Sequence, residues 1–205
     1  MPEGDTIWRT AVALRQRLSG KTVLDARPQA IARLKGRQLE GVEATGKHLI
    51  MQFEGGVALH SHMGMTGSWH LYRPAERWRE PTWTATVVLG FDDVVAVCFA
   101  APKMELVADA EQPVAHLGPD ILVYPFGLEE VLRRARAAGA ATIGELLLEQ
   151  RVCAGIGNIY KCESLWIERI NPWAAPGDLS DEALRRLYLT ARDLMRRSLL
   201  APIGR

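Results

Sequence analysis

A change in hydrophobic periodicity near residue 118 is the feature that most constrains how this chain can fold. Before it, apolar and polar residues alternate in short runs; residues 49–53 are apolar at every odd position, as a half-buried strand requires. After it, apolar residues recur at offsets of three and four, which predicts helices. A strand-rich half followed by a helical half predicts an α+β fold in two domains.

The individual elements follow from the same periodicities. Residues 4–18 are expected to form an amphipathic helix, because apolar residues recur from Ile7 to Leu18 at helical offsets. Strands are expected at 22–27, 47–53, 57–62, 67–72, 83–91 and 94–99, with hairpin turns at 55–56 and 92–93. Helices are expected at about 128–138, 142–150, 157–168 and 180–200. The Pro/Gly-rich residues 118–126 predict a linker between a domain at 1–117 and a domain at 127–205.

Composition sets few further limits. The chain has 205 residues, 48% of them hydrophobic, which is enough for a sizeable core. Its formal net charge of +1 does not indicate a nucleic-acid-binding protein by itself. Three cysteines without a CxxC pair indicate a reducing compartment and no cysteine-based structural zinc site. Because there is no apolar run of 18 residues and no signal-peptide pattern, we expect a cytoplasmic protein without a membrane partner.

The second residue is the main indication of chemistry. Removal of Met1, which is usual before a residue as small as proline, leaves Pro2 with a free secondary amine. The pKa of an α-amine is about 7.7–8.0, so at neutral pH it holds far more free base than a lysine does. Such an amine attacks carbonyl carbons to give an iminium ion, and the adjacent Glu3 can donate the proton. The alternative is that Pro2 simply begins a helix.

Two motifs in the strand-rich half carry candidate side chains. Lys47 precedes a predicted strand, where it could hold a phosphate or transfer a proton; a solvated strand end is the alternative. His60 and His62 share one strand face and suggest a metal pair. We identify no nearby carboxylate or cysteine that completes the pair, so we expect no metal. Met65 lies between glycines in a predicted turn, as a wedge between bases would, although core packing is the alternative.

The strongest local signal lies in the helical half, at residues 153–161. Gly155 and Gly157 permit a sharp turn, and Asn158 is expected to cap the helix that follows. Helix N-terminal amides beside an asparagine form a phosphate site, and Lys161 lies in the same motif. An ordinary turn between two helices is the alternative.

Together these residues resemble the formamidopyrimidine-DNA glycosylase/endonuclease VIII family over essentially the whole chain. Five motifs occur in the family's order: Pro2-Glu3-Gly4, Gly46-Lys47-His48, residues 62–67 (HMGMTG), 117–120 (LGPD) and 155–158 (GIGN). The resemblance implies an N-terminal helix and β-sandwich domain that carries catalysis, followed by an all-helical DNA-binding domain with a helix–two-turn–helix motif. It also implies a base-excision-repair DNA glycosylase and AP lyase, with damaged DNA as its partner.

The resemblance assigns catalytic roles to three matching residues. Pro2 would attack C1′ of the damaged nucleotide, and Glu3 would protonate the opening sugar. The resulting Schiff base would undergo β-elimination, which cuts the strand 3′ to the lesion. Lys47 matches a lysine that contacts phosphate and assists proton transfer.

Four further residues match DNA contacts of the family. Met65 corresponds to the residue that fills the gap left by the extruded nucleotide. Asn158 corresponds to a phosphate-binding asparagine, with Lys161 in the same motif, and His116 falls where endonuclease VIII relatives place a basic contact. Residues 99–105 look more like the endonuclease VIII version of this stretch, which favours oxidised pyrimidines over 8-oxoguanine.

The sequence departs from the family pattern at its C-terminal end. The family usually continues into a zinc or zincless finger, whose arginine grips phosphate beside the lesion. This sequence stops at Arg205 without a CxxC pair, so either it is a truncated form or the protein lacks the finger, and we expect no zinc or other cofactor in this chain. Loss of those contacts weakens binding, so we expect Schiff-base chemistry at abasic sites to survive and excision from duplex DNA to be weak. We expect a monomer.

Two other functions compete with the repair enzyme. One is a catalytically weak module that binds damaged or abasic DNA. The other is an N-terminal-nucleophile hydrolase, which would also use the free amine. The hydrolase gives no reason for a phosphate-binding turn at Asn158 or for a wedge at Met65, so it ranks below the others.

Overall fold

The computed structural model describes residues 2–201. Contacts within the chain divide it into two compact units. The first contains Pro2 and Thr6–Ala115, and the second contains Glu3–Asp5 together with the chain from His116 onward. The N-terminal segment therefore contributes residues to both units.

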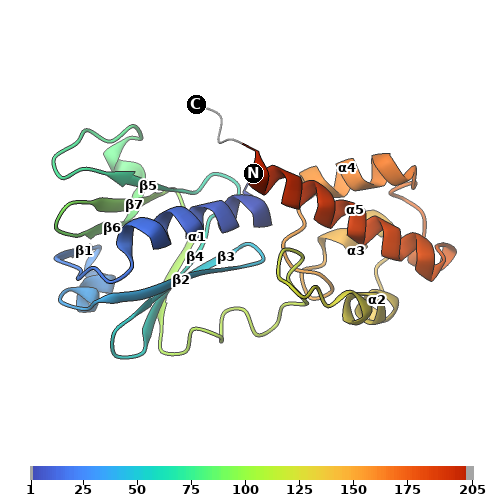
Figure 1. The fold of residues 1–205 in the computed structure, drawn as a ribbon, viewed down its shortest axis with the longest axis horizontal. Coiled ribbons are helices and arrows are strands. Elements are labelled where there is room, and N and C mark those ends of the chain that lie inside the picture. Colours follow the sequence, from blue (N-terminus) through green and yellow to red (C-terminus); the bar gives the residue numbers. More distant parts are fainter. Residues whose placement is uncertain (1, 202–205) are drawn as a thin grey trace. The chain divides into compact units, whose positions relative to one another are not determined.

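Two antiparallel four-stranded sheets form the first unit (Figure 1). The first sheet has the order β1-β6-β7-β5, from Asp25–Arg27, Ala85–Gly90, Val95–Phe99 and Ser68–Tyr72. The second has the order β2-β3-β4-β8, from Leu39–Thr45, His48–Phe53, Val57–His62 and Lys103–Val107. Short 3₁₀ helices lie at Gln29–Leu34 and Thr82–Thr84. Both sheets contribute to one buried apolar cluster, which confirms the predicted sandwich.

Helix α1 (Gly4–Leu18) packs against this sandwich, and its bounds are the predicted ones. Its apolar positions Ile7, Leu14 and Leu18 belong to the same buried cluster as the strand residues. In Figure 1 the helix runs along the sheets. The amphipathic pattern of this helix is therefore explained by burial of one face on the sheets.

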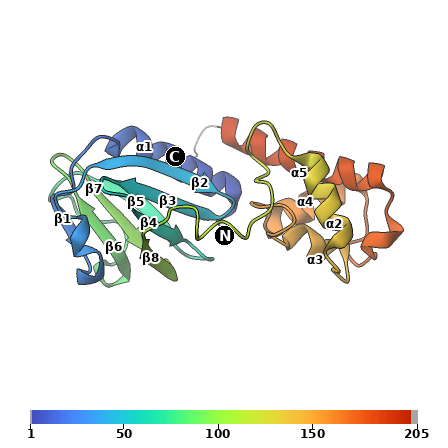
Figure 2. The same cartoon turned by 90° about the horizontal axis from the view of Figure 1, so that it is seen from below.

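Helices α2 to α5 form the second unit and lie together in Figure 2. Their bounds are Leu128–Ala137, Ile143–Leu148, Asn158–Glu168 and Asp181–Leu200, with a 3₁₀ turn at Pro176–Asp178. Tyr188 and Leu187 of α5 are fully buried in a core that also contains Leu146 of α3. Within residues 2–201, no helix is long and apolar enough to cross a membrane.

Two strands, β2 and β8, were absent from the prediction. A register shift between Leu39 and Gly41 interrupts the alternation of β2. Strand β8 is a five-residue edge strand, and its alternation is carried by only two apolar residues, the half-buried Met104 and Leu106, so its local signal is weak. The omission of β8 matters because this strand places Glu105 opposite His60.

Candidate active site

The Glu3 carboxylate is anchored at the N-terminus of helix α4. It is 1% exposed and accepts hydrogen bonds from the backbone amides of Gly157 (2.9 Å), Ile159 (2.7 Å) and Tyr160 (3.4 Å). These amides have no partner inside the helix, and the helix dipole favours negative charge at this end. A Cβ atom at Gly157 would lie 2.4 Å from Cδ of Glu3, so the glycine makes room for the carboxylate.

The next two residues are fixed in the same way. The Gly4 amide donates to the carbonyl oxygen of Gly155 at 3.0 Å. The buried Asp5 carboxylate accepts hydrogen bonds of 2.7 Å from both the Tyr160 and Ser198 hydroxyls. Burial raises the pKa of Tyr160 to about 12, so its hydroxyl remains a donor. Residues 3–5 are thus held rigidly, and Pro2 is one peptide bond from them.

Gln150 supports the turn that receives Glu3. Its side-chain amide donates to the carbonyl oxygens of Leu148 (2.7 Å) and Ile156 (3.0 Å), and its oxygen accepts from the Gly155 amide (3.0 Å). All three partners are backbone atoms, which leave no mark in the sequence. For this reason the sequence offered no signal for Gln150.

The LGPD motif at residues 117–120 also supports this turn. The Pro119 carbonyl accepts from the Ala154 amide at 3.0 Å, and the Ala154 carbonyl accepts from the Ile121 amide at 3.1 Å. The Gly118 amide donates to the Gln150 carbonyl at 2.9 Å. The motif therefore acts through the backbone, by pairing with the segment that carries Gly155.

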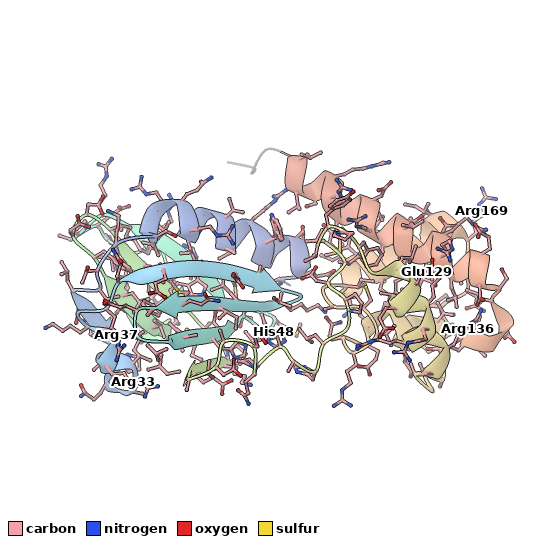
Figure 3. All side chains as sticks on the ribbon, turned by 60° about the horizontal axis from the view of Figure 1, so that its bottom comes forward. Arg33, Arg37, His48, Glu129, Arg136 and Arg169 are labelled. Carbon is pink, nitrogen blue, oxygen red and sulfur yellow. The ribbon has the colours of Figure 1, made fainter. Side chains whose placement is uncertain are left out.

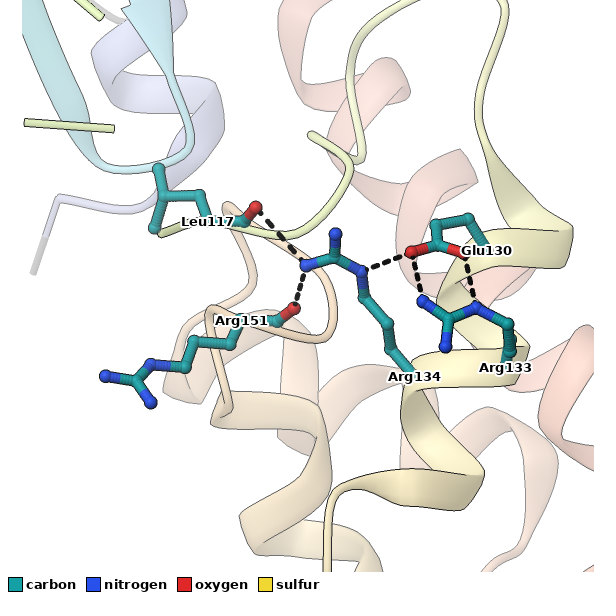
Figure 4. Close-up of polar contacts among 5 residues, drawn as sticks. All are labelled: Leu117, Glu130, Arg133, Arg134 and Arg151. Carbon is teal, nitrogen blue, oxygen red and sulfur yellow. Dashed lines mark hydrogen bonds and ion pairs between the residues drawn. The ribbon is translucent and has the colours of Figure 1, made fainter. Parts of the chain in front are cut away.

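Arg134 of α2 bonds both the LGPD motif and the segment that leads into the Glu3-binding turn (Figure 4). Its guanidinium donates to the carbonyl oxygens of Leu117 (3.4 Å) and Arg151 (2.8 Å), and also to Glu130 (2.6 Å). Arg133 and Arg134 together lower the pKa of Glu130 to about 2. The basic run in α2 is therefore paired within its own unit.

Asn158 does not cap helix α4, so that part of the prediction is wrong. The N-cap residue is Gly157, and no side chain of the cap bonds the helix. Glu3, which is distant in sequence, takes three of the amides that were predicted to hold phosphate. The exposed Asn158 instead accepts a 2.8 Å hydrogen bond from Lys161. His116, also exposed, precedes Leu117 in the same unit.

Lys47 and Met65 belong to the strand-rich unit and lie on two tight turns. Lys47 is half-buried at the tip of the β2–β3 hairpin, and its charge contributes to lowering the pKa of His62. Met65 is 72% exposed between β4 and β5, so the alternative of core packing is wrong for this residue. Gly64, which precedes Met65, has φ +58°, a conformation that glycine adopts readily.

Three histidines and a carboxylate form a cluster on one sheet face. His60 is fully buried; one ring nitrogen is 2.9 Å from His48 and the other is 2.9 Å from Glu105. His62 contacts His48 edge to face, with ring centroids 4.9 Å apart. A carboxylate therefore does lie beside this pair, contrary to the prediction. Among residues 2–201, however, no group of three or more His, Cys, Asp or Glu side chains is placed to hold a metal ion.

Known proteins match this chain over nearly all of its length. The formamidopyrimidine-DNA glycosylase N-terminal domain matches residues 1–105, and the formamidopyrimidine-DNA glycosylase H2TH domain matches residues 117–202. "Probable endonuclease 8 2" of Streptomyces coelicolor is 38% identical, over 100% of this chain and 77% of that protein. "DNA-(apurinic or apyrimidinic site) lyase Nei2" of Mycolicibacterium smegmatis is 34% identical, over 95% of this chain and 77% of that protein.

A solved structure has the same fold. It is Lactococcus lactis formamidopyrimidine-DNA glycosylase, bound non-covalently to DNA that contains an AP site. The match has a TM-score of 0.84 at 21% identity and covers 97% of this chain and 82% of that one. This likeness confirms the predicted α+β architecture.

Proposed function

The chain belongs to the formamidopyrimidine-DNA glycosylase/endonuclease 8 family of DNA glycosylases and AP lyases, and on that premise we propose that its N-terminal proline is the nucleophile. The observation that carries this proposal is the anchoring of Glu3 by three amides of the α4 N-terminus. A nucleophilic residue one peptide bond from a rigid segment has few orientations, and such restriction lowers the entropic part of the barrier.

The reaction follows from the chemistry of a secondary amine. The Pro2 nitrogen bonds to C1′ of an abasic sugar in its aldehyde form, and the carbonyl oxygen leaves as water. The iminium ion withdraws electrons from C2′, a base removes the C2′ proton, and the C3′–O bond breaks to release the 3′ strand. Water then hydrolyses the iminium and restores the amine. The steps need no cofactor.

Glu3 and Lys47 are the proposed acid–base groups. Glu3 is adjacent to Pro2; its carboxylate takes the proton that the Pro2 nitrogen loses on bonding C1′ and passes it to the sugar oxygen as the ring of a damaged nucleotide opens. Lys47 lies at a hairpin tip, where its ammonium binds a phosphate and assists proton transfer.

Four residues are proposed to bind DNA. Met65 has the exposure that a wedge needs, and it occupies the space that the extruded nucleotide leaves. The exposed Asn158 and the half-buried Lys161 bind a backbone phosphate through their side chains, because Glu3 occupies the neighbouring amides. His116 adds a further DNA contact.

Oxidised pyrimidines are the proposed substrates, and the protein is proposed to act as a monomer on DNA in a bacterial cytoplasm. Relatives at 38% and 35% identity are named as endonuclease 8, the branch that residues 99–105 also resemble, and this supports the preference. An excision panel of oxidised pyrimidines and purines in duplex DNA tests it. Faster excision of 8-oxoguanine than of any oxidised pyrimidine would contradict it.

Borohydride trapping on abasic-site DNA tests the proposed nucleophile. The protein with a processed N-terminus should give a covalent adduct after reduction. The same protein with an extension ahead of Pro2 should give none, because the nitrogen is then an amide. Tight binding of abasic DNA without any adduct would instead support a damage-binding module.

A further inference from the structure

The outer face of the sheet β2-β3-β4-β8 carries a continuous row of polar side chains. Side chains two residues apart share a face, so His60 and His62 of β4 point the same way. Strand register sets His48 opposite His62 and Glu105 opposite His60. Lys103 completes the row, with its ammonium 3.0 Å from Glu105. Leu49 and Leu59, on the other face, lie in the apolar core.

The carboxylate at one end fixes where the protons of the row lie. Hydrogen bonds from His60 and Lys103 lower the pKa of Glu105, so the carboxylate is charged and can only accept. Nδ1 of His60 therefore carries a proton and donates it to Glu105. Burial lowers the pKa of His60, so the ring is neutral and its Nε2 accepts. The proton between His60 and His48 consequently belongs to Nδ1 of His48.

The row is connected to both DNA-contacting turns of its unit. His48 follows Lys47 directly, and its ring meets that of His60 edge to edge through their hydrogen bond, with ring centroids 5.1 Å apart and planes 13° from parallel. His62 is close enough to Lys47 for that charge to affect its pKa. Nδ1 of His62 also accepts the Gly64 amide at 3.2 Å, at the start of the turn that carries Met65. Figure 3 labels His48 within this part of the sheet.

We propose that His60 and Glu105 are positioning residues of the enzyme, which fix the hairpin tip of Lys47 and the turn of Met65 through His48 and His62. This role rests on the proposed function. Side chains that support a site through a second layer of hydrogen bonds determine how accurately the acting groups are placed. With the row intact, Lys47 is already oriented when DNA arrives.

Two substitutions of Glu105 test whether its role depends on accepting the hydrogen bond from His60. Glu105→Leu removes the acceptor, whereas Glu105→Gln keeps an oxygen that accepts from Nδ1 of His60. On abasic-site DNA, we expect Glu105→Leu to lower kcat of strand cleavage about tenfold while KM changes less than about twofold. Glu105→Gln should keep most of the activity. The matched control is Glu40→Leu, an exposed carboxylate on β2 of the same sheet.

Nitrogen–proton correlation spectra of the histidine rings provide a readout that a merely structural role would not predict. We expect His60 to be neutral with its proton on Nδ1 in the wild type and in Glu105→Gln. In Glu105→Leu the tautomer should shift toward Nε2–H. A wild-type His60 with its proton on Nε2 would overturn the assignment.

The outcomes for the enzyme and for the row are distinguishable. Cleavage at equal rates by the wild type and Glu105→Leu, with the fold intact by circular dichroism, overturns the positioning role alone. Equal loss in Glu105→Leu and Glu40→Leu overturns it too, because the effect would not be specific to the row. A wild type that neither cleaves nor traps abasic DNA contradicts the proposed function, and the positioning role with it.

Discussion

The Glu3 anchor and the histidine row both bury polar side chains, but they satisfy them differently. Glu3 is bound by backbone amides of α4, whereas His60 is bound by the side chains of His48 and Glu105. Substitution by any residue except proline leaves a backbone amide in place, so the anchor is sensitive mainly to added atoms. The histidine row is held by side-chain partners, so it is sensitive to substitutions that remove a side-chain donor or acceptor. The two regions therefore fail under opposite kinds of change.

The largest effect is expected from one added methyl group in the anchor. Gly157→Ala would place Cβ 2.4 Å from Cδ of Glu3, so the carboxylate must leave its amides. We expect the rate of borohydride trapping to fall about 100-fold or more, because misplacement by about 1 Å has effects of this size. Gly177→Ala is the control, since nothing lies within 4 Å of its Cβ. A trapping rate in Gly157→Ala equal to that of this control would refute the role of the anchor.

Gln150 resembles both regions: a side chain makes the bonds, as in the histidine row, and backbone atoms are the partners, as in the Glu3 anchor. Gln150→Ala leaves the Gly155 amide and two carbonyls without these partners. Unsatisfied groups of this kind cost about 1–3 kcal/mol, so the free energy of unfolding should fall by about 2 kcal/mol. Urea denaturation measures it, with the exposed Gln112→Ala as a comparison. A change of similar size in both variants would argue against a specific role for Gln150.

Two neighbouring arginines test whether backbone partners matter more than ion pairs. Both bond Glu130, but Arg134 also holds the carbonyl oxygens of Leu117 and Arg151. We expect Arg134→Ala to lower the free energy of unfolding by about 1 kcal/mol, because the site is partly exposed. Arg133→Ala should leave it within error, since exposed pairs contribute little. Thermal denaturation measures both variants. A larger loss of stability in Arg133→Ala than in Arg134→Ala would contradict this expectation.

The smallest and most gradual effect is expected from pH. Burial lowers the pKa of His60 and of His62 from 6.5, so below that pH the unfolded chain binds more protons than the folded one. Stability is therefore full above about pH 6.5 and falls as the pH drops toward the lowered values. The charged and titratable groups that face His60 or His62 are Lys47 and His48 of the β2–β3 hairpin and Lys103 and Glu105 of β8.

Urea denaturation between about pH 7 and pH 5 measures this slope. In Glu105→Gln the decline should be steeper, because the charge of Glu105 raises the pKa of His60 and so offsets part of the effect of burial. Stability that increased as the pH fell over this range would contradict a neutral, buried histidine row.

Regular periodicity explains what the sequence could predict of the fold. Helices α1, α4 and α5 show uninterrupted apolar faces, and their predicted bounds agree with the structure to within one residue. Strand β2 was missed because a register shift interrupts its alternation, and β8 was missed because it is a short edge strand with only two apolar residues in alternation. Prediction from one sequence fails where the pairing partner, rather than the local pattern, determines the strand.

The residues of the candidate site also fall into those with a local sequence signal and those without one. Motifs predicted Pro2, Glu3, Lys47, Met65 and Asn158, because each lies in a short run of unusual residues. The capping role of Asn158 was wrong, since the carboxylate that bonds α4 comes from residue 3. Glu105 and Gln150 were missed because their partners are far away in sequence or belong to the backbone. Long-range partners have no local signal.

Tandem mass spectrometry of the borohydride-reduced adduct tests the central claim most directly. After digestion, the N-terminal peptide that begins at Pro2 should carry the mass of the reduced sugar, with the fragment ions placing it on the proline nitrogen. An adduct on Lys47 or on any other lysine, with an unmodified N-terminal peptide, would contradict the account.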